Sequence, residues 1–162
     1  MRQKTDKLYS VIESFSNAML ITQSSDGLHS RPMAVAKVEP TSNTIWFATE
    51  MDSGKIDEIL SNPEVNVSFQ GKLGFASLTG EAKITQDQDK VDDLWSPAWK
   101  VWFPKGKDES SITLIEVHAS QGEFWDASGK EGISMLVDAA KAIMNDEKPE
   151  TSKSRNAKVN LD

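Results

Sequence analysis

Residues 64–85 read EVNVSFQGKLGFASLTGEAKIT, and this stretch decides the fold. Apolar and polar side chains alternate through 64–70 and again through 75–85, as they do in strands that bury one face. A glycine stands at each end of the short connection 71–74, where a tight turn needs backbone freedom. The sequence therefore predicts two antiparallel strands joined by a short turn.

Three further strands are expected before this pair, over 17–23, 28–39 and 44–50. The first two are joined by Asp26-Gly27, a strong signal for a tight hairpin turn. Pro32 lies in the second strand and cannot donate a backbone hydrogen bond to a neighbour. We therefore expect this strand to lie at an edge or to carry a bulge at Pro32.

Helices and additional strands complete the pattern. Helices are expected over 3–16, 53–61, the polar segment 85–95 and 131–145. After the third helix, two more strands are expected, over 112–119 and near 122–126. At least six strands of this kind, mostly joined by short connections, predict an antiparallel barrel or sandwich with helices outside it.

Length and charge limit the classes of protein to consider. A chain of 162 residues suits one domain, which we expect over 1–145, followed by a polar, disordered tail over 146–162. The net charge of -7 argues against nucleic-acid binding and against attachment to anionic lipid. There is no cysteine, no apolar run long enough to span a membrane, and no signal-peptide pattern at the N-terminus. These observations favour a cytoplasmic protein.

Few residues of the chain suggest catalysis. The two histidines, His29 and His118, are expected on solvated surfaces rather than as ligands or bases, and no metalloprotease, hydrolase or nucleotide-binding motif occurs. Adjacent carboxylates such as Asp57-Glu58 do not face each other on a helix, so a solvated helix face explains them. No catalytic residue is therefore assigned.

One group of polar residues suggests a phosphate site near the start of the helix expected at 53–61. Lys55 lies in its first turn, where the helix dipole disfavours a cation. Ser53 can cap the helix with its hydroxyl, and the free N–H groups of the first turn point outward. Arg31, Lys37 and Thr49 come from the neighbouring strands. A bound dianion would make Lys55 favourable here; the alternative is that Lys55 simply extends into water.

Five short segments together resemble the pyridoxamine 5'-phosphate oxidase-like, FMN-binding split-barrel family, and within it the general stress protein 26 branch. They are SRPM (30–33), WFAT (46–49), SGK (53–55), NPEV (62–65) and EFW (123–125). The resemblance covers roughly residues 5–127. It implies a mainly β (α+β) fold, a six-stranded antiparallel split β-barrel with Greek-key topology and peripheral helices. It also implies a homodimer with FMN in clefts at the interface.

The same resemblance implies which residues contact the flavin. The expected contacts with the phosphate and ribityl chain are Arg31, Ser53 and Lys55. The residues expected to line the ring are Pro32, Met33, Ala48 and Thr49. Trp125 is expected near the flavin of the partner subunit.

Two departures from the vitamin B6 oxidases argue against pyridoxamine 5'-phosphate oxidation. The Arg-x-His pair that follows EFW in those enzymes is replaced by DASGKEG, and GFA at 74–76 lacks their glutamine. The preferred hypothesis is a stress-related, FMN-dependent oxidoreductase of unknown substrate, with NAD(P)H as a candidate reductant and FAD as an alternative ligand. The competing hypotheses are a non-catalytic flavin-binding, storage or sensing protein and a ligand-free interaction module.

A tryptophan-rich segment, 94–103, allows two interpretations. The spacing of Trp95, Trp99 and Trp102 places them on one face of a helix, unless Pro97 breaks it. Packing in the core or at a dimer interface is the favoured interpretation. The alternative is a lid over the flavin ring.

Overall fold

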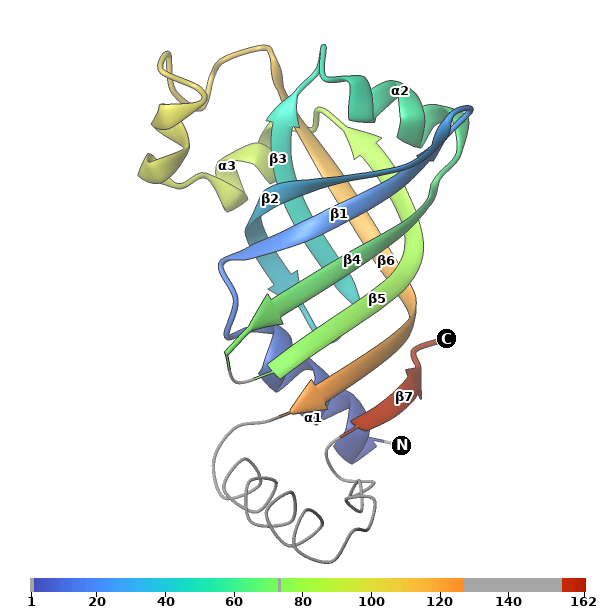
Figure 1. Ribbon diagram of the computed structural model, residues 1–162. Coiled ribbons are helices and arrows are strands. Elements are labelled where there is room, and N and C mark those ends of the chain that lie inside the picture. Colours follow the sequence, from blue (N-terminus) through green and yellow to red (C-terminus); the bar gives the residue numbers. More distant parts are fainter. Residues whose placement is uncertain (1, 73, 127–155) are drawn as a thin grey trace, which may run out of the picture.

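Six antiparallel strands close into a barrel, and helices lie on its outside and at its ends (Figure 1). The structure is a computed structural model that describes residues 2–72, 74–126 and 156–162. The barrel strands are β1 (Asn17–Ser24), β2 (Gly27–Glu39), β3 (Thr44–Glu50), β4 (Glu64–Gly71), β5 (Gly74–Thr85) and β6 (Ile112–Asp126). The helices are α1 (Arg2–Ile12), α2 (Gly54–Ser61), α3 (Gln88–Leu94) and the 3-10 helix η1 (Pro97–Val101).

The strand order confirms the expected split barrel. Strands follow one another as β3-β2-β1-β4-β5-β6, and pairing of β3 with β6 closes the ring. This closing ladder runs from Thr44 opposite His118 to Glu50 opposite Ile112. Because β4 returns to lie beside β1, strands β1 to β4 form a Greek key.

The last barrel strand differs from its prediction. Two strands were expected over 112–119 and near 122–126, but β6 is one continuous strand. A shift in its register with β5, between Thr79 and Gly80, absorbs an extra residue near Ser120. Polar residues and a glycine at 120–122 look like a turn in the sequence. The backbone stays extended because β5 continues to pair with both halves of β6.

The C-terminal segment corrects another prediction. Residues 156–160, expected to be disordered, form strand β7 (Asn156–Asn160), which extends the sheet beside β6. Val159 is buried against the barrel core, which gives this polar segment an apolar anchor. The rest of the predicted tail and the predicted helix 131–145 lie outside the described residues.

The N-terminal helix is also shorter than expected. It ends at Ile12 rather than residue 16 because the chain must turn into β1, and the N–H of Phe15 bonds the carbonyl of Ile12 in that turn. The side chains of α1 that face the barrel, Leu8 and Ile12, are fully buried. The helix therefore covers the barrel end near the C-terminal half of β6 (Figure 1).

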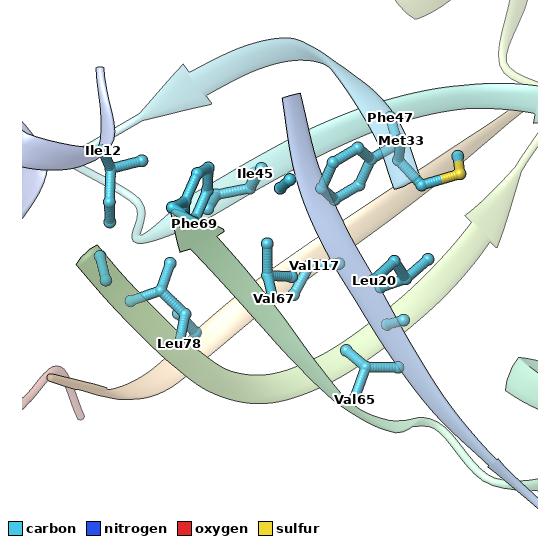
Figure 2. Close-up of a cluster of buried hydrophobic side chains, with 14 of the residues drawn as sticks. Ile12, Leu20, Met33, Ile45, Phe47, Val65, Val67, Phe69, Leu78 and Val117 are labelled. Carbon is cyan, nitrogen blue, oxygen red and sulfur yellow. The ribbon is translucent and has the colours of Figure 1, made fainter. Parts of the chain in front are cut away.

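The barrel interior is filled by apolar side chains from every strand (Figure 2). Alternation along each strand sends every second side chain inward, as in β4, where Val65, Val67 and Phe69 are all buried. The labelled members of this core are Ile12, Leu20, Met33, Ile45, Phe47, Val65, Val67, Phe69, Leu78 and Val117. Ile56 and Ile59 of α2 join it from the other barrel end.

A second, smaller core lies outside the barrel, where α3 and η1 pack on β3 and β6. Asp87 starts α3 by accepting hydrogen bonds from the N–H groups of Asp89 and Lys90. The buried members of this outer core are Trp46, Val91, Leu94, Trp99, Phe103, Ile112 and Leu114. The segment from α3 to η1 thereby lies beside β3 (Figure 1). Within the described residues, no helix has the length and hydropathy to cross a membrane.

Candidate functional site

A pocket opens where β2 and β3 separate. Their ladder begins at Val35 opposite Phe47, so Pro32 to Ala34 pair only with β1, while Ala48 to Glu50 pair only with β6. Proline suits this local edge because it has no N–H to leave unpaired, which confirms the expectation for Pro32. The resulting pocket has a volume of about 280 Å³. It is lined by Pro32, Met33, Ala34, Ala48, Thr49, Glu50, Ser53, Lys55, Trp102 and Phe103.

Lys55 supplies the positive charge of this pocket. Its ammonium donates to the hydroxyl of Thr49, with an N–O distance of 2.9 Å, and to the hydroxyl of Ser53. The side chain is half-buried and forms no salt bridge within the described residues. Burial lowers the pKa of Lys55, and the positive charge of nearby Arg31 lowers it further, while the carboxylates of Glu50 and Glu58 act in the opposite direction. The ammonium therefore has nearby carboxylates but no direct ionic partner among the described residues, and hydroxyl groups hold it at the pocket.

Ser53 occupies the expected cap position but does not cap the helix. Its backbone precedes the first residue of α2, yet its side chain makes no hydrogen bond to the backbone of the first turn. The expected cap is absent because the hydroxyl of Ser53 accepts a hydrogen bond from the ammonium of Lys55 instead. The N–H of Ile56 donates to the carbonyl of Ser53, whereas the N–H groups of Gly54 and Lys55 at the start of α2 have no intrahelical partner.

Arg31 lies near this pocket but does not line it. Its guanidinium donates to a carboxylate oxygen of Glu58 at 2.8 Å and to the hydroxyl of Thr22. Both Arg31 and Glu58 are largely buried, with side chains 22% and 15% exposed. Arg31 still lowers the pKa of Lys55, so the two cations lie within electrostatic range of each other. The structure therefore brings Arg31 to the site as a neighbouring charge that is already paired.

Glu58 is the member of the site that the sequence interpretation missed. It was assigned to a solvated helix face, but its carboxylate accepts hydrogen bonds from Thr22 and Arg31, and His29 Nδ1 lies 2.5 Å from it. These hydrogen bonds, the one from Thr22 foremost, lower the pKa of Glu58 to about 2. The hydrogen bond to Glu58 in turn raises the pKa of His29. Glu58 lies three residues after Lys55, and this helical spacing could have indicated its place beside the site.

Comparison with known proteins places this geometry in a family. Residues 3–150, most of the chain, match the sequence model of the family described as pyridoxamine 5'-phosphate oxidase like. The chain belongs to this family. The resemblance noted in the sequence, including its general stress protein 26 branch, is thereby confirmed.

Three relatives in or near this family illustrate the similarity. Protein bli-3 of Neurospora crassa is 29% identical over 154 residues, which cover 88% of this chain and 73% of that protein. General stress protein 26 of Bacillus subtilis is 26% identical over 97 residues, or 57% of this chain and 69% of that protein. A solved structure, the general stress FMN/FAD binding protein of Xanthomonas citri, is 27% identical with a TM-score of 0.69. That match covers 80% of this chain and 93% of the other.

Most residues that the family resemblance singled out do meet at the pocket. Pro32, Met33, Ala48 and Thr49 line it together with Ser53 and Lys55. Trp125 does not join them within one chain. It lies near the far end of β6, opposite Phe75 of β5, and both rings are exposed on the outer face of the barrel.

Lys37 was grouped with the phosphate site from its spacing, and this was wrong. Its ammonium lies 3.2 Å from Glu39 and 3.3 Å from Asp93, and it does not line the pocket. The register of β2 against β3 shifts between Val35 and Lys37. Lys37 pairs with Glu39 of its own strand and with Asp93 of α3 rather than with the start of α2.

The tryptophan-rich segment of this family member does not present one helical face. The helix α3 ends at Leu94, directly before Trp95, and Pro97 starts the separate helix η1. Trp99 is buried in the outer core, whereas Trp102 is 53% exposed and lines the pocket. In the described part of the chain, no cluster of His, Cys, Asp or Glu side chains could hold a metal ion, and His118 is exposed as expected.

Proposed function

We propose that this chain binds FMN in the pocket between β2 and β3 and acts as a stress-related, flavin-dependent oxidoreductase. The observation that carries the proposal is the half-buried ammonium of Lys55, which has hydroxyl partners but no salt bridge among the described residues. A phosphate dianion beside Ser53 and the start of α2 would give this ammonium a direct ionic partner. The place of Lys55 in the first turn then has a physical reason.

The remaining walls of the pocket suit a flat ring. Pro32, Ala34, Ala48 and Phe103 offer apolar surface directly beside the cationic end. Such a combination of a few polar anchors and an apolar lining is typical of cofactor sites. Bound FMN would supply the redox chemistry. The FMN/FAD binding relative from Xanthomonas citri supports a flavin as the ligand and keeps FAD as the alternative.

Residues in and beside the pocket would contribute to flavin binding in different ways. Thr49 holds the ammonium of Lys55 toward the pocket, and Ser53 lies beside it. Glu58 fixes Arg31, whose positive charge adds to the attraction for a phosphate without entering the pocket. The apolar walls would exclude water from the ring.

A homodimer is part of the proposal. Trp125 lies far along β6 from the pocket of its own chain, so only a second copy could bring it near a bound flavin. Trp125 and Phe75 form an exposed aromatic pair, which is a common feature of interfaces. The cytoplasmic location remains a prediction from the sequence.

A non-catalytic flavin-binding, storage or sensing protein is the second candidate. The observation in its favour is that Glu50 and Lys55 are the ionisable side chains among the described lining residues. No histidine, the commonest general acid or base, is among these lining residues. A small-molecule substrate would then have to react with the flavin unaided, or not at all.

Purification tests flavin binding, and kinetics separate the two candidates. We expect the isolated protein to show flavin absorbance bands, or to acquire them when titrated with FMN. Absence of binding to both FMN and FAD would contradict both candidates. Steady-state oxidation of NAD(P)H by the FMN-loaded protein, with a panel of acceptors, then decides. Turnover supports the oxidoreductase, whereas tight binding without turnover supports storage or sensing.

A further inference from the structure

Trp102 stands apart from the other tryptophans of its segment. Trp99 is 6% exposed and belongs to the outer core, but Trp102 is 53% exposed and lines the pocket with Ser53 and Lys55. An indole exposed at a pocket offers a large, flat apolar surface to a ligand that enters it.

The backbone of Trp102 is fixed although its side chain is free. Its N–H donates to the carbonyl of Trp99 at 2.9 Å, and the N–H of Phe103 donates to the same oxygen at 2.8 Å. Phe103 is 2% exposed, and its ring lies 6.5 Å from that of Trp99. The outer core therefore anchors Trp99 and Phe103, and the turn between them carries Trp102. In the part of the chain that the structure describes, the indole N–H has no hydrogen-bond acceptor.

We propose that Trp102 is a ligand-contacting residue whose indole packs against the aromatic ring of the bound flavin. This inference rests on the proposed function, because it needs a phosphate at Ser53 and Lys55 to place that ring. Because its backbone is already fixed, Trp102 loses only side-chain freedom when its indole stacks on a ligand. The tryptophan segment would then have two roles, with Trp99 stabilising the outer core and Trp102 contacting the flavin.

Substitution of Trp102 tests this inference by comparing FMN with riboflavin, which shares the ring but lacks the phosphate. We expect Trp102→Ala to weaken both ligands by the same factor, about tenfold, as loss of one aromatic contact predicts. Trp102→Phe should retain affinity within about threefold because it keeps an aromatic face. Val101→Ala is the matched control, since Val101 is 80% exposed and does not line the pocket.

Each outcome has a defined meaning. Unchanged affinity of Trp102→Ala, or weakening of FMN alone, would overturn the inference. So would a loss of affinity that only follows a loss of dimerisation in sedimentation. If Trp102→Ala does not fold, Trp102→Leu preserves apolar volume and should show the same loss for both ligands; normal binding by that variant would refute the stacking role. If the wild type binds no flavin, the proposed function itself fails, whereas wild-type binding with normal binding by Trp102→Ala refutes this inference alone.

Discussion

At the scale of single residues, charge balance distinguishes Lys55 from Arg31. Arg31 has a carboxylate partner in Glu58, whereas Lys55 has hydroxyl partners and no salt bridge among the described residues. Residue spacing in the sequence was enough to place Lys55, Ser53 and Thr49 together. It could not assign Glu58 to Arg31, because that pairing depends on how α2 packs against β1 and β5 at the end of the barrel.

Removing the charge of Glu58 should destabilise the protein without a ligand. Glu58→Gln leaves the largely buried guanidinium of Arg31 without its countercharge, at a cost of about 2 kcal/mol. Urea unfolding of the apoprotein measures this. Asp57→Asn on the same helix is the matched control, because Asp57 is exposed, and it should change stability by less than about 0.5 kcal/mol. Equal effects of the two substitutions would show that the Glu58 network contributes nothing specific.

The same network should make stability depend on pH in two directions. The hydrogen bonds from Thr22, His29 and Arg31 lower the pKa of Glu58 from 4.5 to about 2, so its contribution is lost as pH falls through this range. The hydrogen bond to Glu58 raises the pKa of His29 above 6.5, so that contribution is present below pH 6.5 and is lost as pH rises through the raised value.

Urea midpoints from pH 2 to pH 9 would reveal both effects. The difference in urea midpoint between wild type and Glu58→Gln should be largest between pH 4.5 and pH 6.5. It should shrink below pH 4.5, where Glu58 becomes protonated, and above pH 6.5, where His29 loses its proton. Subtraction is necessary because other groups titrate too; for example, the hydrogen bond from Trp46 helps to lower the pKa of Glu39 to about 2. A difference that stays constant with pH would contradict the account.

At the scale of elements, alternation predicted the strands well and failed where the pattern was interrupted. The predicted ranges of the first five strands differ from β1 to β5 by at most one residue at either end. The two strands predicted over 112–119 and near 122–126 form the single strand β6, because β5 pairs with both halves of it. The local sequence does not reveal this pairing. β7 was missed because a short polar segment with one buried valine carries almost no periodic signal.

The close approach of the paired strands β5 and β6 at Gly80 predicts that adding one methyl group there lowers stability. A Cβ at Gly80 would lie 2.0 Å from the carbonyl oxygen of His118, so Gly80→Ala must displace backbone at the bulge. We expect a loss of about 3 kcal/mol in the free energy of unfolding. Gly54→Ala is the matched control, since a Cβ there meets nothing within 4 Å and alanine favours the helix by up to about 1 kcal/mol. Thermal unfolding of both variants measures the contrast, and similar melting temperatures would contradict the packing described.

At the scale of the whole molecule, the separation of Trp125 from the pocket makes a prediction about two chains. If each site combines Lys55 of one chain with Trp125 of the other, Lys55→Ala and Trp125→Ala homodimers should both bind FMN weakly. A mixed dimer of the two variants should recover one normal site, because one chain supplies an intact Lys55 and the other an intact Trp125. Titration of tagged, purified heterodimers measures this. Failure to recover any normal site would show that Trp125 does not act across the interface.

The central claim is that Lys55 recognises a phosphate, and the ratio of the riboflavin Kd to the FMN Kd tests it most directly. Isothermal titration of the wild type should show FMN bound at least about tenfold more tightly than riboflavin, as a charge-assisted contact predicts. Lys55→Ala should lower the ratio several-fold, with little change for riboflavin, while Arg31 and the start of α2 retain a small preference for FMN. Lys100→Ala, which removes an exposed charge outside the pocket, should leave the ratio unchanged. Equal affinities in the wild type, or an undiminished ratio in Lys55→Ala, would contradict the claim.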